Sequence, residues 1–132
     1  MIEWDIASKL ENDDTLATLL GSGTDPKIYP IRAPQGASDP YILYSAAGTG
    51  PEEDVLDELR IQLNCVSSSY KTAGDIRDRV KAILGLRDRV SILSEDYYIY
   101  TGKLTGESDL IDTEQNLHHR IIFFNFKYLK KF

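Results

Sequence analysis

The sequence has few of the residues that usually support chemistry or crosslinking. Cys65 is the one cysteine among 132 residues, so the chain cannot form an internal disulfide. This cysteine lies in an alternating apolar pattern, where a buried thiol behaves as a small hydrophobic side chain. We therefore expect Cys65 to belong to the core.

Clusters of basic residues are also scarce. The chain has 15 basic and 21 acidic side chains, which give a net charge of −6, and its longest Lys/Arg run is Lys130-Lys131. Electrostatic binding of nucleic acid depends on a positive surface that neutralises phosphates. The charge balance therefore argues against electrostatic binding of DNA or RNA.

Long apolar runs are missing as well. No stretch approaches the roughly 20 residues that a membrane-spanning helix needs. The N-terminal stretch Met1-Ile2-Glu3-Trp4-Asp5 has neither the basic nor the apolar segment of a secretory signal. From the sequence we expect a cytoplasmic protein without a membrane partner.

Motifs for catalysis, metals and cofactors are not found. His118 and His119 are neighbours, and neighbours in a strand point to opposite faces, which disfavours a shared metal. The turns Gly21-Ser22-Gly23 and Gly48-Thr49-Gly50 lack the Gly-Lys-Ser/Thr ending of a phosphate-binding loop. The acidic residues lack the spacing of a calcium loop. We expect no enzyme activity, no cofactor and no metal, and we favour structural roles for both histidines.

Two amphipathic helices are expected. Apolar residues recur at helical spacing in residues 2–20, and Gly21 provides a stop. Asn12-Asp13-Asp14 interrupts this pattern, and Asp14 is the expected N-cap of a second short helical piece. The other helix covers residues 70–84 and follows the capping cluster Ser67-Ser68-Ser69. Its apolar face consists of Tyr70, Ala73, Ile76, Val80, Ile83 and Leu84.

The remaining apolar segments have the composition of strands. Residues 59–65 alternate strictly between apolar and polar, which indicates one buried face. The other expected strands are residues 28–29, 40–46, 90–92 with 97–101, and 117–129. The resulting order α-β-β-β-α-β-β predicts an α+β fold, with a mostly antiparallel sheet that carries two helices on one face. A chain of this length is expected to form one domain, residues 1–132.

Several of these strands are apolar on both faces. The stretches are Tyr41-Ile42-Leu43-Tyr44, Tyr97-Tyr98-Ile99-Tyr100 and Ile121-Ile122-Phe123-Phe124. Two helices cover only one face of a sheet, and a large exposed apolar patch usually marks a protein interface. Self-association through the sheet is the simplest explanation, and long loops folded over the sheet are the alternative.

Two long acidic connections are expected, at residues 47–57 and 102–116. Loops of this length are usually functional or disordered. Their composition suggests arms that become ordered on a partner, although a solvated loop without a partner fits equally. The acidic residues are Glu52, Glu53, Asp54 and Asp57 in the first connection, and Glu107, Asp109, Asp112 and Glu114 in the second.

A series of short segments occurs in a fixed order along most of the chain. The segments are Leu16-Ala17-Thr18-Leu19-Leu20-Gly21, Ile28-Tyr29-Pro30, Ala33-Pro34-Gln35-Gly36, Pro40-Tyr41-Ile42-Leu43-Tyr44, Arg60-Ile61-Gln62-Leu63-Asn64-Cys65 with the helix after it, and Arg120-Ile121-Ile122-Phe123-Phe124-Asn125-Phe126. This series resembles the tail-completion proteins of long-tailed bacteriophages and prophages, which include tail terminators and tail-to-head joining proteins. Residues 86–116 match only in strand character and in a long loop.

The resemblance implies an α/β fold with two helices flanking a sheet, assembled as a hexameric ring at the head-proximal end of the tail tube. Such a ring stops tail-tube polymerisation and docks the head connector, without catalysis. The implied partners are further copies of the chain, the tail-tube protein and the head-connector or stopper protein. DNA would pass through an acidic lumen without specific binding, because like charges repel. The implied location is the virion tail, assembled in the cytoplasm of the bacterial host.

Three prolines stiffen the connection that precedes residues 41–44. Pro30, Pro34 and Pro40 disfavour helix at the preceding residues and keep the segment extended. We expect this connection at a subunit or tube contact. The expected interface residues are Tyr29, Pro34, Gln35, Tyr41, Glu52, Glu53, Asp54, Glu107, Asp109 and Asp112. A monomeric or dimeric binding module or enzyme, with a pocket near residues 97–100, is the alternative, and the oligomeric state distinguishes the two.

Overall fold

The computed structural model describes residues 2–21, 27–51, 57–84 and 96–131. In chain order the elements are α1 (Ile2–Glu11), α2 (Asp14–Leu20), β1 (Ile28–Pro30), β2 (Tyr41–Pro51), β3 (Asp57–Ser67), α3 (Tyr70–Leu84), β4 (Tyr97–Asp112) and β5 (Leu117–Lys130). The fold is α+β, as the sequence predicts. The element order is α-α-β-β-β-α-β-β, so the predicted order misses one helix. The strand expected at residues 90–92 lies outside the described residues.

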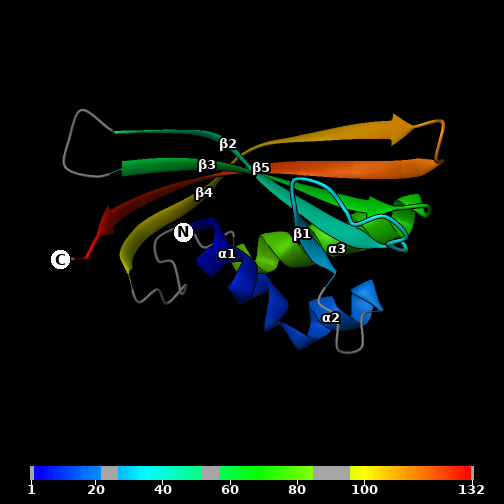
Figure 1. The fold of residues 1–132 in the computed structure, drawn as a ribbon, viewed down its shortest axis with the longest axis horizontal. Helices are drawn as coiled ribbons and strands as arrows, with labels where there is room; N and C mark the ends of the chain where they lie inside the picture. The colour runs from blue at the N-terminus through cyan, green and yellow to red at the C-terminus, as the bar shows by residue number, and fades with distance from the viewer. Residues whose placement is uncertain (1, 22–26, 52–56, 85–95, 132) are drawn as a thin grey trace.

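The described strands form one sheet in the order β1-β2-β3-β5-β4. β1 pairs with β2 in parallel, and the other three pairings are antiparallel, which confirms the mostly antiparallel prediction. Figure 1 shows the three helices on the same side of the sheet. The prediction that the helices lie on one face of the sheet is therefore confirmed, but there are three helices where two were expected.

The N-terminal segment forms two helices, because the chain leaves the helical conformation after α1 and Asp13 caps the start of α2. Asp13 has extended backbone angles, and its Oδ2 accepts a hydrogen bond of 2.8 Å from the backbone N–H of Leu16. Asp14, the predicted cap, is instead the first residue of α2. Gly21 ends α2 as predicted, with a left-handed φ of 62° that suits glycine.

α3 has the predicted bounds and the predicted serine cap. The Oγ of Ser69 accepts a hydrogen bond of 3.3 Å from the N–H of Thr72, and the Oγ of Ser67 accepts one of 3.1 Å from the N–H of Ser69. The expectation that Tyr70 lies on the buried face is wrong, because its side chain is 51% exposed at the first position of the helix. The buried residues of α3 are Ala73, Gly74, Ile76, Val80 and Leu84.

Both predicted acidic connections are shorter than expected. Residues 102–112 belong to β4 and pair with β5, so a loop over residues 102–116 is wrong. Its two glycines and many polar side chains disfavour a strand, but pairing along the length of β5 overrides that preference. Likewise, residues 47–51 continue β2 and pair with β3 up to Asp57, while residues 52–56 lie outside the described part of the chain.

The core lies between the helices and the sheet face that they cover. From β3 it takes the alternating residues Leu59, Ile61, Leu63 and Cys65, and it includes side chains from all three helices. The predicted alternation of this strand is confirmed. Cys65 is fully buried, and burial raises the pKa of its thiol to about 12. The thiol is therefore a packed core group, as expected from the sequence.

The sheet face away from the helices is mixed in character. Alternation places Leu43, Ile121 and Phe123 on it, which confirms that β2 and β5 have apolar residues on both faces. β3 contributes mainly polar side chains there, such as Arg60, Gln62 and Asn64. Polar side chains of β3 therefore lie between the apolar side chains of β2 and those of β5 over much of this face.

Candidate functional site

The connection between β1 and β2 forms an open groove at one edge of the sheet. Its cavity volume is about 580 Å³, and it is lined by Tyr29, Pro30, Arg32, Ala33, Pro34 and Gln35. The side chains of Pro34 and Gln35 are exposed. The rings of Tyr29 and Tyr41 lie 6.2 Å apart, and Tyr41 is only 9% exposed. Tyr41 therefore supports Tyr29 from within the sheet, and Tyr29, Pro34 and Gln35 form the accessible surface.

The groove is held to the sheet at both of its ends. The N–H of Ile31 donates to the carbonyl of Tyr44 at 2.8 Å. At the other end, Oδ2 of Asp39 accepts a hydrogen bond of 2.6 Å from the N–H of Ser68, which lowers the pKa of Asp39. These contacts tie the connection to β2 and to the start of α3.

Ile31 stands out within this connection. Its φ is 67°, which is a left-handed conformation that β-branched residues rarely adopt, and its side chain is 75% exposed. Packing in the core does not stabilise this backbone conformation, because the side chain of Ile31 lies outside the core. Ile31 is not predictable from the sequence, because nothing in the stretch around Pro30 signals a positive φ.

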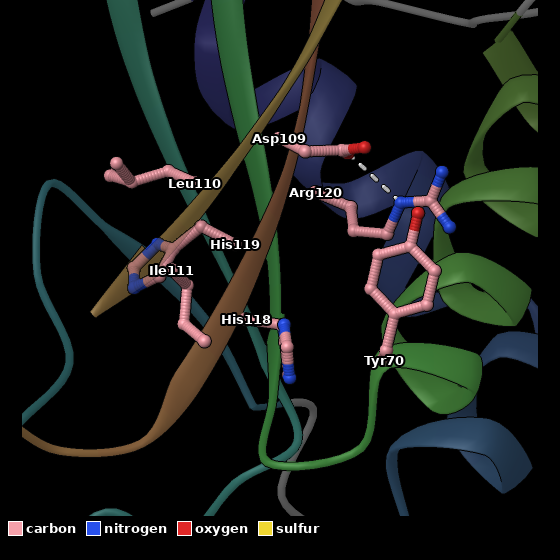
Figure 2. A pocket seen from close by; sticks show the side chains of 7 residues that line it. All are labelled: Tyr70, Asp109, Leu110, Ile111, His118, His119 and Arg120. Carbon is pink, nitrogen blue, oxygen red and sulfur yellow. Dashed lines mark hydrogen bonds and ion pairs between the residues drawn. The ribbon is translucent and has the colours of Figure 1, made fainter. Parts of the chain in front are cut away.

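A second candidate surface lies where β4 and β5 approach their turn. A cavity of about 240 Å³ is lined by Tyr70, Asp109, Leu110, Ile111, His118, His119 and Arg120 (Figure 2). Figure 2 shows Arg120, Asp109 and Tyr70 on one side of the two strands, and Leu110 and His119 on the other. Leu110 is 57% exposed and Ile111 is 49% exposed. This apolar pair is hard to recognise in the sequence, because it lies within an acidic segment.

The three expected acidic residues of β4 all have partners within the chain. Glu107 lies 3.0 Å from Nζ of Lys81 and 3.6 Å from Nε of Arg77, and the Lys81 hydrogen bond lowers the pKa of Glu107. Asp109 accepts a hydrogen bond of 3.0 Å from Nε of Arg120. These carboxylates fasten β4 to α3 and β5.

The third acidic residue has a local role in the turn. Oδ1 of Asp112 accepts hydrogen bonds from the N–H groups of Glu114 at 3.1 Å and Gln115 at 3.2 Å. Asp112 therefore orders the turn that ends the hairpin. The other predicted acidic interface residues, Glu52, Glu53 and Asp54, lie outside the described part of the chain.

The two histidines point to opposite faces of β5, as expected. The rings of His118 and Tyr70 make an edge contact with centroids 5.4 Å apart. Nδ1 of His119 lies 3.3 Å from Nδ2 of Asn64 on β3. Burial lowers the pKa of His119. Both rings thus have structural contacts.

Within residues 2–21, 27–51, 57–84 and 96–131, no group of three or more His, Cys, Asp or Glu side chains is placed to hold a metal. No helix in the described ranges is long and apolar enough to cross a membrane.

Exposed apolar groups at two edges of a sheet are typical of a protein that binds other proteins. The chain belongs to the tail completion protein gp17 family, whose sequence profile matches residues 5–129. This membership confirms the resemblance found in the sequence, and it agrees with a structural rather than an enzymatic protein.

Comparison with solved structures gives a relative with the same fold. The chain is similar to a chain described as "Virion of native gene transfer agent (GTA) particle", with a TM-score of 0.71 and 12% sequence identity. The match covers 96% of this chain and 92% of that chain. No curated protein sequence matches.

Proposed function

We propose that the chain forms a ring, with six copies as the expected number, at the head-proximal end of the tail tube of a phage-like particle. The ring ends tail-tube polymerisation and joins the tail to the head connector. Family membership over residues 5–129 supports a tail-completion role, and the match to a virion chain supports a place in an assembled particle. In this proposal residues 1–132 act as one domain, and assembly takes place in the cytoplasm of the bacterial host.

The observation that carries the proposal is the exposure of large apolar side chains at both edges of the sheet. Ile31 is 75% exposed beside β1, and Leu110 is 57% exposed on β4. A ring requires two different surfaces on each copy, because its contacts run head to tail. Two separate apolar patches on opposite edges fit this requirement better than one patch does.

The remaining partners are the tail-tube protein on one side of the ring and the head-connector protein on the other. Tyr29, Pro34 and Gln35 form a contact surface for a neighbouring subunit or for the tube, with Tyr41 beneath them. DNA passes through the lumen without specific binding. The net charge of −6 supports this point, since like charge disfavours contact with phosphates.

Substitutions that make the connection between β1 and β2 more flexible test the proposed ring. Replacing Pro34 and Gln35 together by glycine removes the restricted backbone and the side chains of the groove, so ring formation should weaken while the fold stays intact. Light scattering coupled to size exclusion measures the ring, and far-ultraviolet circular dichroism measures the fold. The control replaces Ala37 and Ser38 of the same connection by glycine and should retain assembly. Unchanged ring formation by the Pro34/Gln35 variant would count against the proposed contact.

A further inference from the structure

A third cavity lies on the sheet face away from the helices. Its volume is about 450 Å³, and it is lined by Arg60 of β3, Thr105 of β4, and Phe123 and Asn125 of β5. These three strands are neighbours in the sheet, so regular strand pairing holds the lining residues in place. The side chain of Arg60 is 68% exposed, and its guanidinium is therefore within reach of a ligand from solvent.

An irregularity in β4 provides the space for this cavity. The register shifts between Leu104 and Gly106, so Thr105 is an extra residue in the strand, and its Oγ1 donates to the carbonyl of Phe123 at 3.2 Å. Bulges of this kind redirect side chains and are common beside functional sites. Gly106 pairs with Phe123 and has no side chain, which leaves room beside the phenyl ring.

One row of paired residues places a cation on each side of an amide. Arg60 pairs with Asn125, and Asn125 pairs with Lys103, so the Cα atoms of the two cations are about 10 Å apart at the usual strand spacing. Lys127 follows two residues along β5 on the same face and pairs with Glu58. Around this row the described residues therefore carry three basic side chains and one acidic side chain, although the whole chain has a net charge of −6.

Both cations of the row have unused capacity to bind an anion. Glu58 lies 3.3 Å from Nε of Arg60, and the terminal nitrogens of the guanidinium have no partner in the described part of the chain. Lys103 is exposed, and none of the described acidic side chains pairs with it. Guanidinium and ammonium groups form short, strong hydrogen bonds with carboxylates and phosphates. The row is therefore suited to anionic oxygens on both of its sides.

The amide between the two cations needs a donor. Oδ1 of Asn125 is buried, and it accepts no hydrogen bond from the residues that the structure describes. Buried polar atoms nearly always have a partner, which comes from the protein, from water or from a ligand. The terminal torsion of asparagine is soft, so the amide can turn its oxygen towards a donor in the cavity. The row thus fits a ligand with an N–H group between two anionic groups.

An extended acidic segment of another protein has this combination of groups. Alternate side chains of such a segment lie on one side, about 7 Å apart, and its backbone supplies N–H groups between them. Phosphates of DNA only accept hydrogen bonds. A DNA duplex also extends far beyond the site and meets the net charge of −6, whereas a short segment interacts mainly with charges within the Debye length of about 8 Å.

We propose that the row Arg60–Asn125–Lys103 and the cavity beside it bind an extended acidic segment of a partner protein. Carboxylates of the segment pair with Arg60 and Lys103, and a backbone N–H between them donates to Asn125. The methylene groups of an acidic side chain pack on Phe123, in the space that Gly106 leaves open. This inference adds a partner site to the proposed function, and it does not depend on formation of the ring.

Binding of a labelled acidic peptide tests this site. The probe is a short fluorescent peptide that alternates glutamate with threonine, and its anisotropy is measured as the full chain is added up to millimolar concentration. A peptide with glutamine in place of glutamate and a short DNA duplex are measured in the same way. The variants are Arg60→Glu and Lys103→Glu, and the control is Lys71→Glu, with a side chain that is 86% exposed on α3. All three change the net charge equally, and circular dichroism checks the fold.

We expect the acidic peptide to bind the unsubstituted chain, and the neutral peptide to bind much more weakly. Arg60→Glu and Lys103→Glu should each weaken binding by about tenfold or more, because a like charge replaces an opposite one, whereas Lys71→Glu should leave it nearly unchanged. No binding of the acidic peptide, or an equal loss in all three variants, would overturn the inference. Stronger binding of the DNA duplex, lost in the same two variants, would assign the site to phosphates and reject a protein partner.

Discussion

The guanidinium carbon of Arg120 lies 4.4 Å from the centre of the Tyr70 ring, and this contact joins β5 to the first turn of α3. Nε of the same side chain donates to Asp109 at 3.0 Å, and the Arg120 side chain is only 14% exposed. The helix approaches closely, since a Cβ at Gly74 would lie 2.8 Å from Nη1 of Arg120. The β4–β5 hairpin is thus fixed to α3 next to its exposed Leu110 and Ile111.

Removing Arg120 should loosen this attachment. Arg120→Ala loses the cation–π contact and the packed stem, and we expect the free energy of unfolding in urea to fall by about 1–2 kcal/mol. Arg120→Lys should restore only part of the loss, because an ammonium group does not stack as a guanidinium does. Arg60→Ala is the control, with a side chain that is 68% exposed, and should change stability by less than about 0.5 kcal/mol. Equal effects at the two arginines would show that the Arg120 contact does not stabilise the fold.

Gly102 and Gly106 of β4 should respond differently to the same substitution. A Cβ at Gly102 would lie 2.6 Å from Cε1 of Phe126, a fully buried ring, so Gly102→Ala should destabilise the chain by about 1–3 kcal/mol. A Cβ at Gly106 meets its nearest atom, on Phe123, at an ordinary 3.7 Å. Gly106→Ala should therefore leave stability unchanged or slightly higher. Thermal and urea unfolding measure both variants, and similar losses at the two positions would contradict this packing.

Acid should weaken the contact between α2 and α3. Arg79 donates to both carboxylate oxygens of Asp13, at 2.9 and 2.6 Å, and this pairing lowers the pKa of Asp13 below its usual 3.8. A lowered pKa of an acid means that the stabilisation is complete above the ordinary pKa and is lost as the pH falls through the folded-state value. Asp13→Asn keeps an N-cap acceptor but removes the charge, so its destabilisation should be clear at pH 7 and small at pH 2.

The matched control for that experiment is Asp14→Asn. It removes a charge from the adjacent residue, whose side chain does not pair with Arg79 in the structure. Urea unfolding at the two pH values should show a smaller difference for this variant. The same pH dependence at both positions would mean that general charge, and not the Asp13–Arg79 pair, is responsible.

Mild acid should destabilise the folded chain through His119. Burial lowers the pKa of His119 from its ordinary 6.5, so the unfolded chain binds a proton at a pH where the folded chain does not. The free energy of unfolding should therefore decrease as the pH is lowered from 7 to 5. His119→Gln should flatten this part of the profile, whereas His118→Gln should retain the His119 contribution. A profile that His119→Gln leaves unchanged would contradict the assignment.

Much of the fold follows from local sequence signals. The bounds of α3 follow from helical spacing and the serine cap, and the buried face of β3 follows from strict alternation between Leu59 and Cys65. Gly21 ends α2 because only a residue tolerant of φ near 62° fits that position well. In each of these cases the determining physics acts over a few neighbouring residues.

The missed features depend on contacts that are distant in sequence. Residues 102–112 are polar and contain glycine, and they form a strand because β5 supplies a partner. The exposed apolar positions, Ile31, Leu110 and Ile111, and the place of Tyr70 against Arg120 also depend on tertiary packing. Sequence periodicity does not show which acidic side chains form ion pairs. Glu107 and Asp109 were expected in a loop without partners in the chain, but they form ion pairs with Lys81 and Arg120.

The copy number of the assembled chain tests the proposed ring. The measurement is light scattering coupled to size exclusion on the purified chain at high concentration, followed by negative-stain imaging of the large peak. We expect a species of about six copies, each of 14.9 kDa, that appears as a closed ring. A strict monomer at the same concentration, still monomeric when tail-tube protein is added, would contradict it.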